Sequence, residues 1–456
     1  MPEARTSLNP FARLHNGRAV WAWGMFDLAN QSFQLLINTL LFSLFVQQVV
    51  VGDPARGRTT WSLMVASSML LVVLVSPVLG ALADHKAWKR EMLLGSGVVC
   101  AVLTAMLAII QPGQVWLAFA LYLVAALACG LGENFLGSFL PEISTPKNVG
   151  YISALGWTMS YAGALLLLGI AAVYTLGFGH AEPDEARPMF VFSGLWFLAG
   201  IVPAFLFLRE RATPQAGAAH TVVGHAFRRL AASARDTARY RHLARFFAAF
   251  FVYSLGTATV IYFLGLISDD LGNTLGRTIL FALEIALTAG IASALVARFQ
   301  DRVGHLRTVR FFLLTWVVAT AGLAGIKALM PDQGDPGPGL TVAFWVVAGL
   351  VGIGLGGIGT SSRAVVGAFS PAARAGEFFG VWGSVYKLST IVGVLAFGQV
   401  RNALGLPVSL LILAGCFGAG LVLLRFVDER AGIHAAEAAE EDVGPDESPT
   451  ALPPGA

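Results

Sequence analysis

Long apolar stretches separated by short polar segments dominate this sequence of 456 residues. A helix that spans a lipid bilayer needs about 20 mainly apolar residues, and the chain contains twelve windows of this kind. They are centred near Leu36, Leu70, Val102, Val124, Ala164, Trp196, Tyr253, Ala286, Val317, Val347, Val392 and Leu413. A strand of a membrane β-barrel alternates in polarity over about ten residues. These apolar runs do not alternate. The pattern therefore predicts an all-α integral membrane protein with twelve transmembrane helices.

Composition agrees with a membrane protein and excludes several other classes. Of all residues, 56% are hydrophobic and 12% are charged, whereas about a quarter of a soluble domain is charged. The net charge of +3 is too small to indicate nucleic-acid binding. The three cysteines lack the spacing of a disulfide or metal site, and no phosphate-binding Gly-Lys-Ser/Thr motif is present. We therefore expect no cofactor, no metal, no ATP-driven pumping and no enzymatic activity.

Positive charge is distributed unevenly between the loops. If the N-terminus is cytoplasmic, 23 of the 30 lysine and arginine residues fall on that side, as cytoplasmic loops retain positive charge. Both termini are thus predicted to be cytoplasmic. The predicted parts are a cytoplasmic N-terminal arm (1–18), a first six-helix bundle (19–208), a cytoplasmic linker (209–245), a second six-helix bundle (246–427) and an acidic disordered tail (428–456).

The loops after the second and the eighth predicted helix share a pattern of one aspartate followed by basic residues. The members are Asp84, Lys89 and Arg90 in the first loop and Asp301, Arg302, Gly304 and Arg307 in the second. An aspartate beside a tight turn can cap a neighbouring helix and pair with arginine. Short cytoplasmic loops are often basic for reasons of topology alone. Recurrence at equivalent places favours two pseudo-symmetric halves, each with a cytoplasmic gate.

These paired loops resemble the signature loop of the major facilitator superfamily, in which G-x-L-A-D precedes basic residues. Gly80 to Asp84 matches that pattern, and the second loop matches the D-R-x-G core of the family. The first loop departs from it, because Ala87-Trp88 stands where the family has its turn glycine. The resemblance implies the major facilitator fold and solute transport by alternating access.

A narrower resemblance covers nearly the whole chain. Its segments are Trp23 to Phe33, Asn134 to Ile143, Gly156-Trp157, and Glu377 to Gly380 with Lys387. They are similar to the branch that includes autophagy-related vacuolar amino-acid effluxers and their uncharacterised bacterial relatives. The resemblance to those bacterial relatives implies a multi-pass protein of the bacterial inner (cell) membrane. Gln31 and Met25 depart from the pattern of that branch, which bears on the solute more than on the fold.

One face of the first predicted helix is polar. It carries Asp27, Asn30, Gln31, Gln34 and Asn38, and at about 100° per residue these lie within about 60° of one line along the helix. Lipid exposure of such a face is costly, so it forms either a hydrogen-bonded seam with another helix or the wall of a water-filled solute path. A carboxylate favours the second interpretation, and Asp27 is the leading candidate for proton coupling.

Glu133 and Asn134 lie near the inner end of the fourth predicted helix. Their depth, about 9 Å at 1.5 Å per residue, is similar to that of Asp27. The family resemblance implies that helices 1 and 4 both line the central cavity, which makes Glu133 the second candidate for proton coupling. The alternative is a structural role for Glu133 as a partner of Arg90 or Lys147.

The second half contains two charged residues within its predicted spans, Glu284 and Lys387. An ionisable group in a span costs about 2.5–3.5 kcal/mol on insertion scales and usually faces a cavity or a partner. A salt bridge between the two, or from Lys387 to Asp27 or to a solute carboxylate, would remove that cost. Lys387 is therefore a candidate anion-binding or coupling group, whereas Arg363 is better explained as a membrane-surface anchor.

Together these features predict a secondary active transporter that moves a small polar solute by alternating access and is coupled to protons. Amino acids as the solute and efflux as the direction rest on the family resemblance alone. Sugar, drug or lysophospholipid transport within the superfamily is an alternative, as is a membrane sensor that does not transport. We expect the solute, protons and the lipid bilayer as partners, and a monomeric protein.

Overall fold

All twelve predicted windows lie in helices of the structure, which is a computed structural model. It describes residues 11, 14, 16–145, 148–180, 182–210, 228, 235, 237, 240–330, 337–371 and 374–441. Within these residues, eleven helices are long and apolar enough to cross a membrane. The last, Ala375–Phe426, has 52 residues and holds two windows, and Gly405 interrupts it with φ 81° and ψ 169°. The prediction of an all-α membrane protein is confirmed, and the twelfth span follows Gly405.

The first six spans come from the first half of the chain. Their elements are α1 (Gly17–Gln31), η2 (Ser32–Leu41), α2 (Phe42–Phe45), η3 (Val46–Val51), α3 (Pro54–Lys86), α4 (Lys89–Met106), η4 (Leu107–Ile109), α5 (Val115–Ser138), α6 (Leu140–Ile143), α7 (Val149–Ala172), η5 (Val173–Gly177), η6 (Pro183–Ala186) and α8 (Arg187–Phe207). From α1 to η3 the chain forms one helical span, Gly17–Val51.

The remaining spans follow the linker, most of which lies outside the described residues. Their elements are α10 (Arg241–Asp270), α11 (Leu275–Val303), α12 (His305–Leu329), α13 (Gly337–Ala368), α14 (Ala375–Leu423), η8 (Leu424–Phe426) and α15 (Glu429–Glu441).

Local sequence explains where the helices turn. After the first span, Gly52 adopts a left-handed conformation with φ 68°, which glycine adopts without steric cost. The Asp53 side chain then accepts a hydrogen bond from the backbone N–H of Arg56 at 2.7 Å, and Pro54 occupies the first helical position of α3. Aspartate at the cap followed by proline is a typical helix start.

The chain forms two compact units. The first unit comprises residues 1–226, 260–286 and 394–403, and the second comprises residues 227–259, 287–393 and 404–456. The first unit thus holds the first six spans together with parts of α10, α11 and α14. One contact that joins such a part is the hydrogen bond from Trp61 Nε1 to the Tyr262 carbonyl at 2.7 Å. The residue limits of the two predicted bundles remain a prediction.

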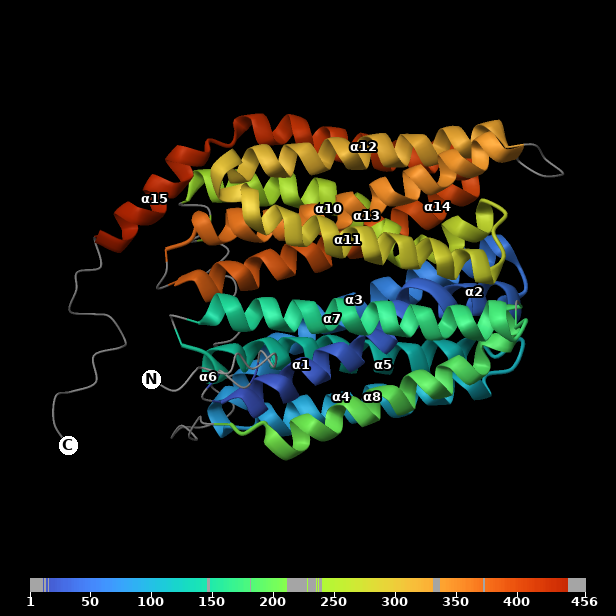
Figure 1. The fold of residues 1–456 in the computed structure, drawn as a ribbon, viewed down its shortest axis with the longest axis horizontal. Helices are drawn as coiled ribbons and strands as arrows, with labels where there is room; N and C mark the ends of the chain where they lie inside the picture. Colours follow the sequence, from blue (N-terminus) through green and yellow to red (C-terminus); the bar gives the residue numbers. More distant parts are fainter. Residues whose placement is uncertain are drawn as a thin grey trace, which may run out of the picture. The chain divides into compact units, whose positions relative to one another are not determined.

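Helix α1 lies in the interior of the first unit. It packs against α5, α7 and α8 (Figure 1). Two glycines of α7 permit close approach, because a Cβ atom on Gly156 would overlap the Trp23 ring and one on Gly163 would lie 2.5 Å from the Leu28 carbonyl oxygen. Small residues at these two positions therefore let the α1 and α7 backbones approach closely.

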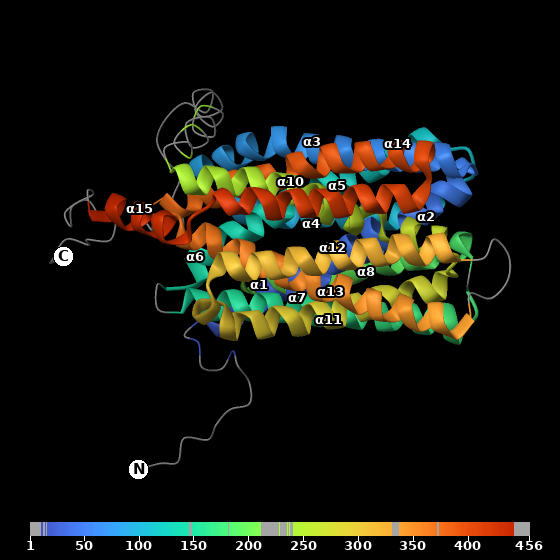
Figure 2. The ribbon, with the colours of Figure 1, turned by 90° about the horizontal axis from the view of Figure 1, so that it is seen from above.

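The second unit contains a helix that the sequence did not predict. The tail was predicted to be disordered from residue 428, but α15 occupies Glu429–Glu441 (Figure 2). The prediction is wrong for this segment because alanine and glutamate favour helix and because α15 packs against α13. At that contact a Cβ atom on Gly432 would lie 2.7 Å from the Phe369 ring. Residues 442–456 of the tail lie outside the described residues.

Candidate functional site

A carboxylate of α5 meets the polar face of the first span inside the first unit. Glu133 Oε1 accepts a hydrogen bond from Gln34 Nε2 at 2.6 Å and one from Asn30 Nδ2 at 3.4 Å. Asn30 is buried, Gln34 is half-buried, and Glu133 is exposed. Asn30 Oδ1 also accepts a hydrogen bond from Cys129 Sγ at 3.2 Å. The sequence placed Glu133 and the helix 1 face on one wall, and the structure joins them directly.

The hydrogen bonds continue along the first span toward its far end. Asn38 Nδ2 donates to Gln34 Oε1 at 2.9 Å, and the buried Tyr122 hydroxyl donates to Asn38 Oδ1 at 2.9 Å. This stretch, Ser32–Leu41, is a π-helix. Such helices are rare and frequently occur at functional sites. Its wider turn brings the Thr39 hydroxyl to the Gln34 carbonyl at 3.0 Å. Glu133 is thus one end of a continuous polar chain of side chains.

Other predicted residues face different neighbours. Gln31 Nε2 donates to the Ser160 hydroxyl of α7 at 2.7 Å, and Asn134 Nδ2 donates to the Ser76 hydroxyl of α3 at 2.7 Å. Asp27 is half-buried on α1, one turn before Gln31. The polar face therefore forms hydrogen bonds to α5 and α7, and Glu133 is the exposed partner among them. Its role as a wall of a solute path remains a prediction.

The two charged residues of the second half belong to different units. Glu284 lies on α11 in the first unit and Lys387 lies on α14 in the second; both are half-buried. A salt bridge between them remains a prediction. Arg363, on α13, lies over the Trp382 ring at 5.7 Å from its centroid, which fits an anchored side chain.

The first predicted gate loop is a tight left-handed turn. Ala87 adopts φ 54° and ψ 52° between α3 and α4. Beyond it, Lys89 Nζ lies 3.4 Å from Glu142 Oε1 in a largely buried ion pair. Arg90 Nε donates to the Leu208 carbonyl at 2.8 Å. The loop thus connects the start of α4 with the end of α8. Ala87 adopts the left-handed conformation at the place where the family pattern has glycine.

The second gate loop also turns at a residue with positive φ, although its ψ of 142° differs from that of Ala87. Gly304, with φ 99°, joins α11 to α12, and Arg310 Nη2 donates to the Leu424 carbonyl at 2.8 Å. Arg302 and Arg307 are exposed. Asp84 and Asp301 lie in the last turns of α3 and α11, and their side chains lie outside the described part of the protein.

The helix after each gate loop is capped by a glutamate that the sequence analysis missed. Glu210 Oε2 accepts from the Arg90 backbone N–H at 3.0 Å. Glu429 accepts from the backbone N–H groups of His305 and Leu306 at 2.7 and 3.0 Å. Burial raises the pKa of the Glu210 carboxyl above its ordinary value, although the hydrogen bond from Arg90 opposes the shift. A carboxylate at a helix N-terminus stabilises the helix dipole.

A short repeat in the sequence could have revealed these caps. Each half ends its sixth span with phenylalanine, an aliphatic residue, a variable residue, glutamate and arginine. The two copies are Phe207-Leu208-Arg209-Glu210-Arg211 and Phe426-Val427-Asp428-Glu429-Arg430. The repeat places an equivalent glutamate after each half, which supports the pseudo-symmetry of the gate loops.

Exchanging alanine and glycine at the two turns should have opposite effects on stability. A left-handed conformation costs an L-residue about 1–2 kcal/mol, so Ala87→Gly should raise the free energy of unfolding by about 1 kcal/mol. Gly304→Ala, at φ 99° and ψ 142°, should lower it by about 1–3 kcal/mol. The measurement is denaturant-induced unfolding of the detergent-purified protein. A loss of stability in Ala87→Gly would contradict the turn geometry.

A second ionic cluster lies at the ends of α3, α10 and α14 within the first unit. Asp270 accepts hydrogen bonds from Arg401 at 2.6 and 2.7 Å, and Arg58 Nη1 lies 3.8 Å from Asp270 Oδ1. Arg58 Nε also donates to Asn402 Oδ1 at 2.8 Å. The neighbouring Asp269 accepts from two glutamines of η3. Arg58 and Arg401 are thus largely buried partners of one carboxylate.

Comparison with a protein-family model identifies a relationship over most of the chain. The model described as "Vacuole effluxer Atg22 like" matches residues 56–437. This range includes Glu133, both gate loops and both capping glutamates.

Curated relatives include a bacterial protein that is similar over nearly its full length. An uncharacterised MFS-type transporter, YxiO of Bacillus subtilis, is 26% identical over 424 residues, which cover 90% of this chain and 94% of the relative. Autophagy-related protein 22-1 of Aspergillus niger is 24% identical over 264 residues, which cover 56% of this chain and 43% of that protein.

Solved structures show the same fold at low sequence identity. A mutant of the nucleoside transporter NupG superposes with a TM-score of 0.68 at 13% identity, over 89% of this chain and 99% of that one. The xylose transporter XylE of E. coli superposes with a TM-score of 0.67 at 12% identity, over 90% of this chain and 99% of that one. The fold is that of the major facilitator superfamily.

Proposed function

The chain belongs to the Atg22-like vacuole effluxer family of membrane transporters, and from this premise we propose that it moves a small polar solute by alternating access, coupled to protons. The observation that carries the proposal is the hydrogen-bonded set of Glu133, Asn30 and Gln34 within two membrane spans. A carboxylate in a span is costly and is usually retained for function.

The geometry favours Glu133 over Asp27 as the proton carrier. Glu133 is exposed on α5, while its Oε1 atom is held by the two amide donors of the first span. A carboxylate held in this way can exchange a proton with water or a solute on its open side while its orientation stays fixed. Asp27, one turn from Asn30 and Gln31 on the same helix, is proposed to bind the solute or to share the proton.

The gate loops are proposed to control access from the basic side of the membrane. The set comprises Asp84, Lys89, Arg90, Asp301, Arg302, Gly304 and Arg307. In the structure, Arg90 bonds to the end of α8 and the start of α12 is capped by Glu429 from α15. Each contact lies within one unit, and we propose that it holds its gate turn in shape while access changes. We propose that this side is cytoplasmic and that both termini lie there, because 23 of 30 basic residues fall on it.

Amino acids are the proposed solute class, and efflux is the proposed direction. The support is the family description, "Vacuole effluxer", together with the polar wall made by Gln34 and Glu133. Polar amide and carboxylate groups suit a hydrogen-bonding, partly cationic solute, and a lipid-like solute would be expected to meet an apolar wall instead.

The test is a transport panel in proteoliposomes that contain a pH-sensitive dye. Amino acids, sugars, nucleosides and lysophospholipids are added singly, and both solute movement and proton movement are recorded. We expect at least one amino acid to move together with protons and to accumulate only while a proton gradient is present. Solute accumulation that survives collapse of that gradient would contradict proton coupling, and movement of sugars or lysophospholipids alone would contradict the solute class.

A further inference from the structure

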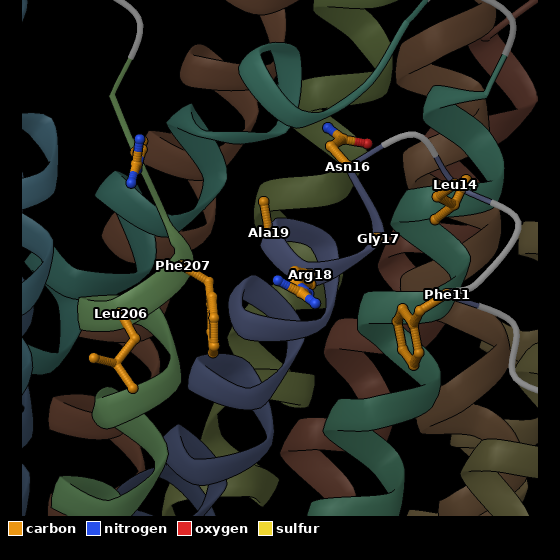
Figure 3. A pocket seen from close by; sticks show the side chains of 9 residues that line it. Phe11, Leu14, Asn16, Gly17, Arg18, Ala19, Leu206 and Phe207 are labelled. Atoms are coloured by element: carbon orange, nitrogen blue, oxygen red, sulfur yellow. The ribbon is translucent and has the colours of Figure 1, made fainter.

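A cavity of about 480 Å³ lies where α1 begins and α8 ends, within the first unit (Figure 3). Phe11 and Leu14 line one side, Leu206 and Phe207 line the other, and Arg18 lies between them (Figure 3). Arg209 completes the lining from the residues that follow α8. None of these residues belongs to the polar network of Glu133 or to the gate loops.

The cavity combines two guanidinium groups with apolar side chains. Arg18 and Arg209 are both exposed, and α1 has no acidic residue in its first turn. Arginine binds phosphate through a planar fork of N–H donors. Asn16 also lines the cavity, but its amide already donates to the Ile143 carbonyl. The large side chains beside the arginines are aromatic or aliphatic, namely Phe11, Leu14, Leu206 and Phe207, and a small hydrated anion would leave these without a partner. The composition matches a ligand with an anionic head and an apolar body.

The apolar lining continues along the outer face of α8. Exposed aliphatic residues recur there at helical spacing, at Val191, Leu195, Val202 and Leu206, with exposed fractions of 40%, 60%, 51% and 57%. In a multi-pass membrane protein, such a stripe contacts lipid acyl chains. Trp21 packs edge-on against Phe207 at 6.3 Å between ring centroids, and tryptophan is enriched where a span meets the lipid headgroups. The cavity therefore lies at headgroup level, at the end of a lipid-facing stripe.

We propose that this cavity binds the phosphate headgroup of an anionic phospholipid, with Arg18 and Arg209 on the phosphate and an acyl chain along the α8 stripe. Basic pockets of this kind at the cytoplasmic ends of transmembrane helices suit anionic lipids. Bound lipid would join the N-terminal residues Phe11 and Leu14 to the end of α8. The expected consequence is that anionic lipid stabilises the first unit.

The test uses the full-length purified protein in a neutral detergent. Dioctanoyl phosphatidylglycerol, dioctanoyl phosphatidylcholine and inorganic phosphate are titrated separately, and the dissociation constants are obtained from the shift in melting temperature. We expect phosphatidylglycerol to bind most tightly. The double variant Arg18→Gln/Arg209→Gln should bind it about 30-fold more weakly, since each basic residue near anionic lipid contributes about a factor of five.

A matched control removes the same number of charges elsewhere. Arg298→Gln/Arg425→Gln alters two exposed arginines that do not line the cavity, and it should bind phosphatidylglycerol as the wild type does. If the double variant folds poorly, the single variant Arg209→Glu, at an exposed position after α8, takes its place. Its binding of phosphatidylglycerol is then compared with that of the wild type and the control. Three outcomes would overturn the proposal: equal binding of phosphatidylcholine, equally tight binding of inorganic phosphate, or equal loss of binding in the control.

Discussion

Replacing Glu133 with glutamine is expected to abolish solute accumulation while the protein still folds. Glutamine has nearly the same size, and its carbonyl oxygen can still accept the hydrogen bonds from Asn30 and Gln34 that Glu133 Oε1 accepts at 3.4 and 2.6 Å. It can neither carry a negative charge nor exchange a proton. Without a group that takes up and releases a proton, the proton gradient cannot drive the solute, so accumulation should fall to the level reached without a gradient.

The measurement is uptake into proteoliposomes of whichever solute the transport panel identifies, with and without an imposed proton gradient. Exchange of solute without a gradient should persist in Glu133→Gln, because exchange does not require release of the proton. Glu437→Gln on the exposed face of α15 is the control for expression and reconstitution, since its carboxylate is 61% exposed. Wild-type accumulation and wild-type pH dependence in Glu133→Gln would rule out Glu133 as the coupling group.

Replacing Asp270 with asparagine should cost about 3 kcal/mol of stability or more. Asp270 is 13% exposed and Arg401 is 16% exposed, and Arg58 lies on the other side of the same carboxylate, 10% exposed. Loss of the negative charge leaves two largely buried guanidinium groups without their counter-ion, and removing one partner of a buried pair is strongly destabilising.

Denaturant unfolding in detergent measures this effect, with Asp184→Asn as the control. Asp184 pairs with Arg187 at 2.8 Å but is 63% exposed, so its substitution should change the free energy of unfolding by less than about 1 kcal/mol. The double variant Asp270→Asn/Arg401→Gln should be less destabilised than the sum of the two single variants, because the pair acts as a unit. Additive effects, or a small effect of Asp270→Asn alone, would contradict the role of the cluster.

The sequence pattern predicted the turns of the gate loops but not the residues that cap the helices after them. The recurrence of aspartate and basic residues identified both turns, and each turn contains a residue with positive φ, Ala87 or Gly304. The pattern assigned the capping role to residues within the loops. In the structure the carboxylates that bond to the helix N-termini are Glu210 and Glu429, each from the residues that follow the sixth span of its half. A turn is decided by neighbouring residues, whereas a cap from a distant segment depends on how the helices pack.

The sequence by itself determined the helices and which of their faces are polar. Apolar runs of spanning length require helices in a bilayer because every backbone polar group must be satisfied within the segment. Asn30, Gln34 and Asn38 are four residues apart, and the helical repeat alone places them on one face.

Only the tertiary structure decided which partners these residues meet. Gln34 and Glu133 are 99 positions apart in the chain, and Arg401 and Asp270 are 131 apart. The periodicity of one helix does not reveal how deeply a second helix is inserted or which face that helix turns toward the first. Both depend on side-chain packing between helices, such as the contact of α7 glycines with α1. The polar face of the first span became a site with a defined carboxylate only when that packing brought Glu133 against it.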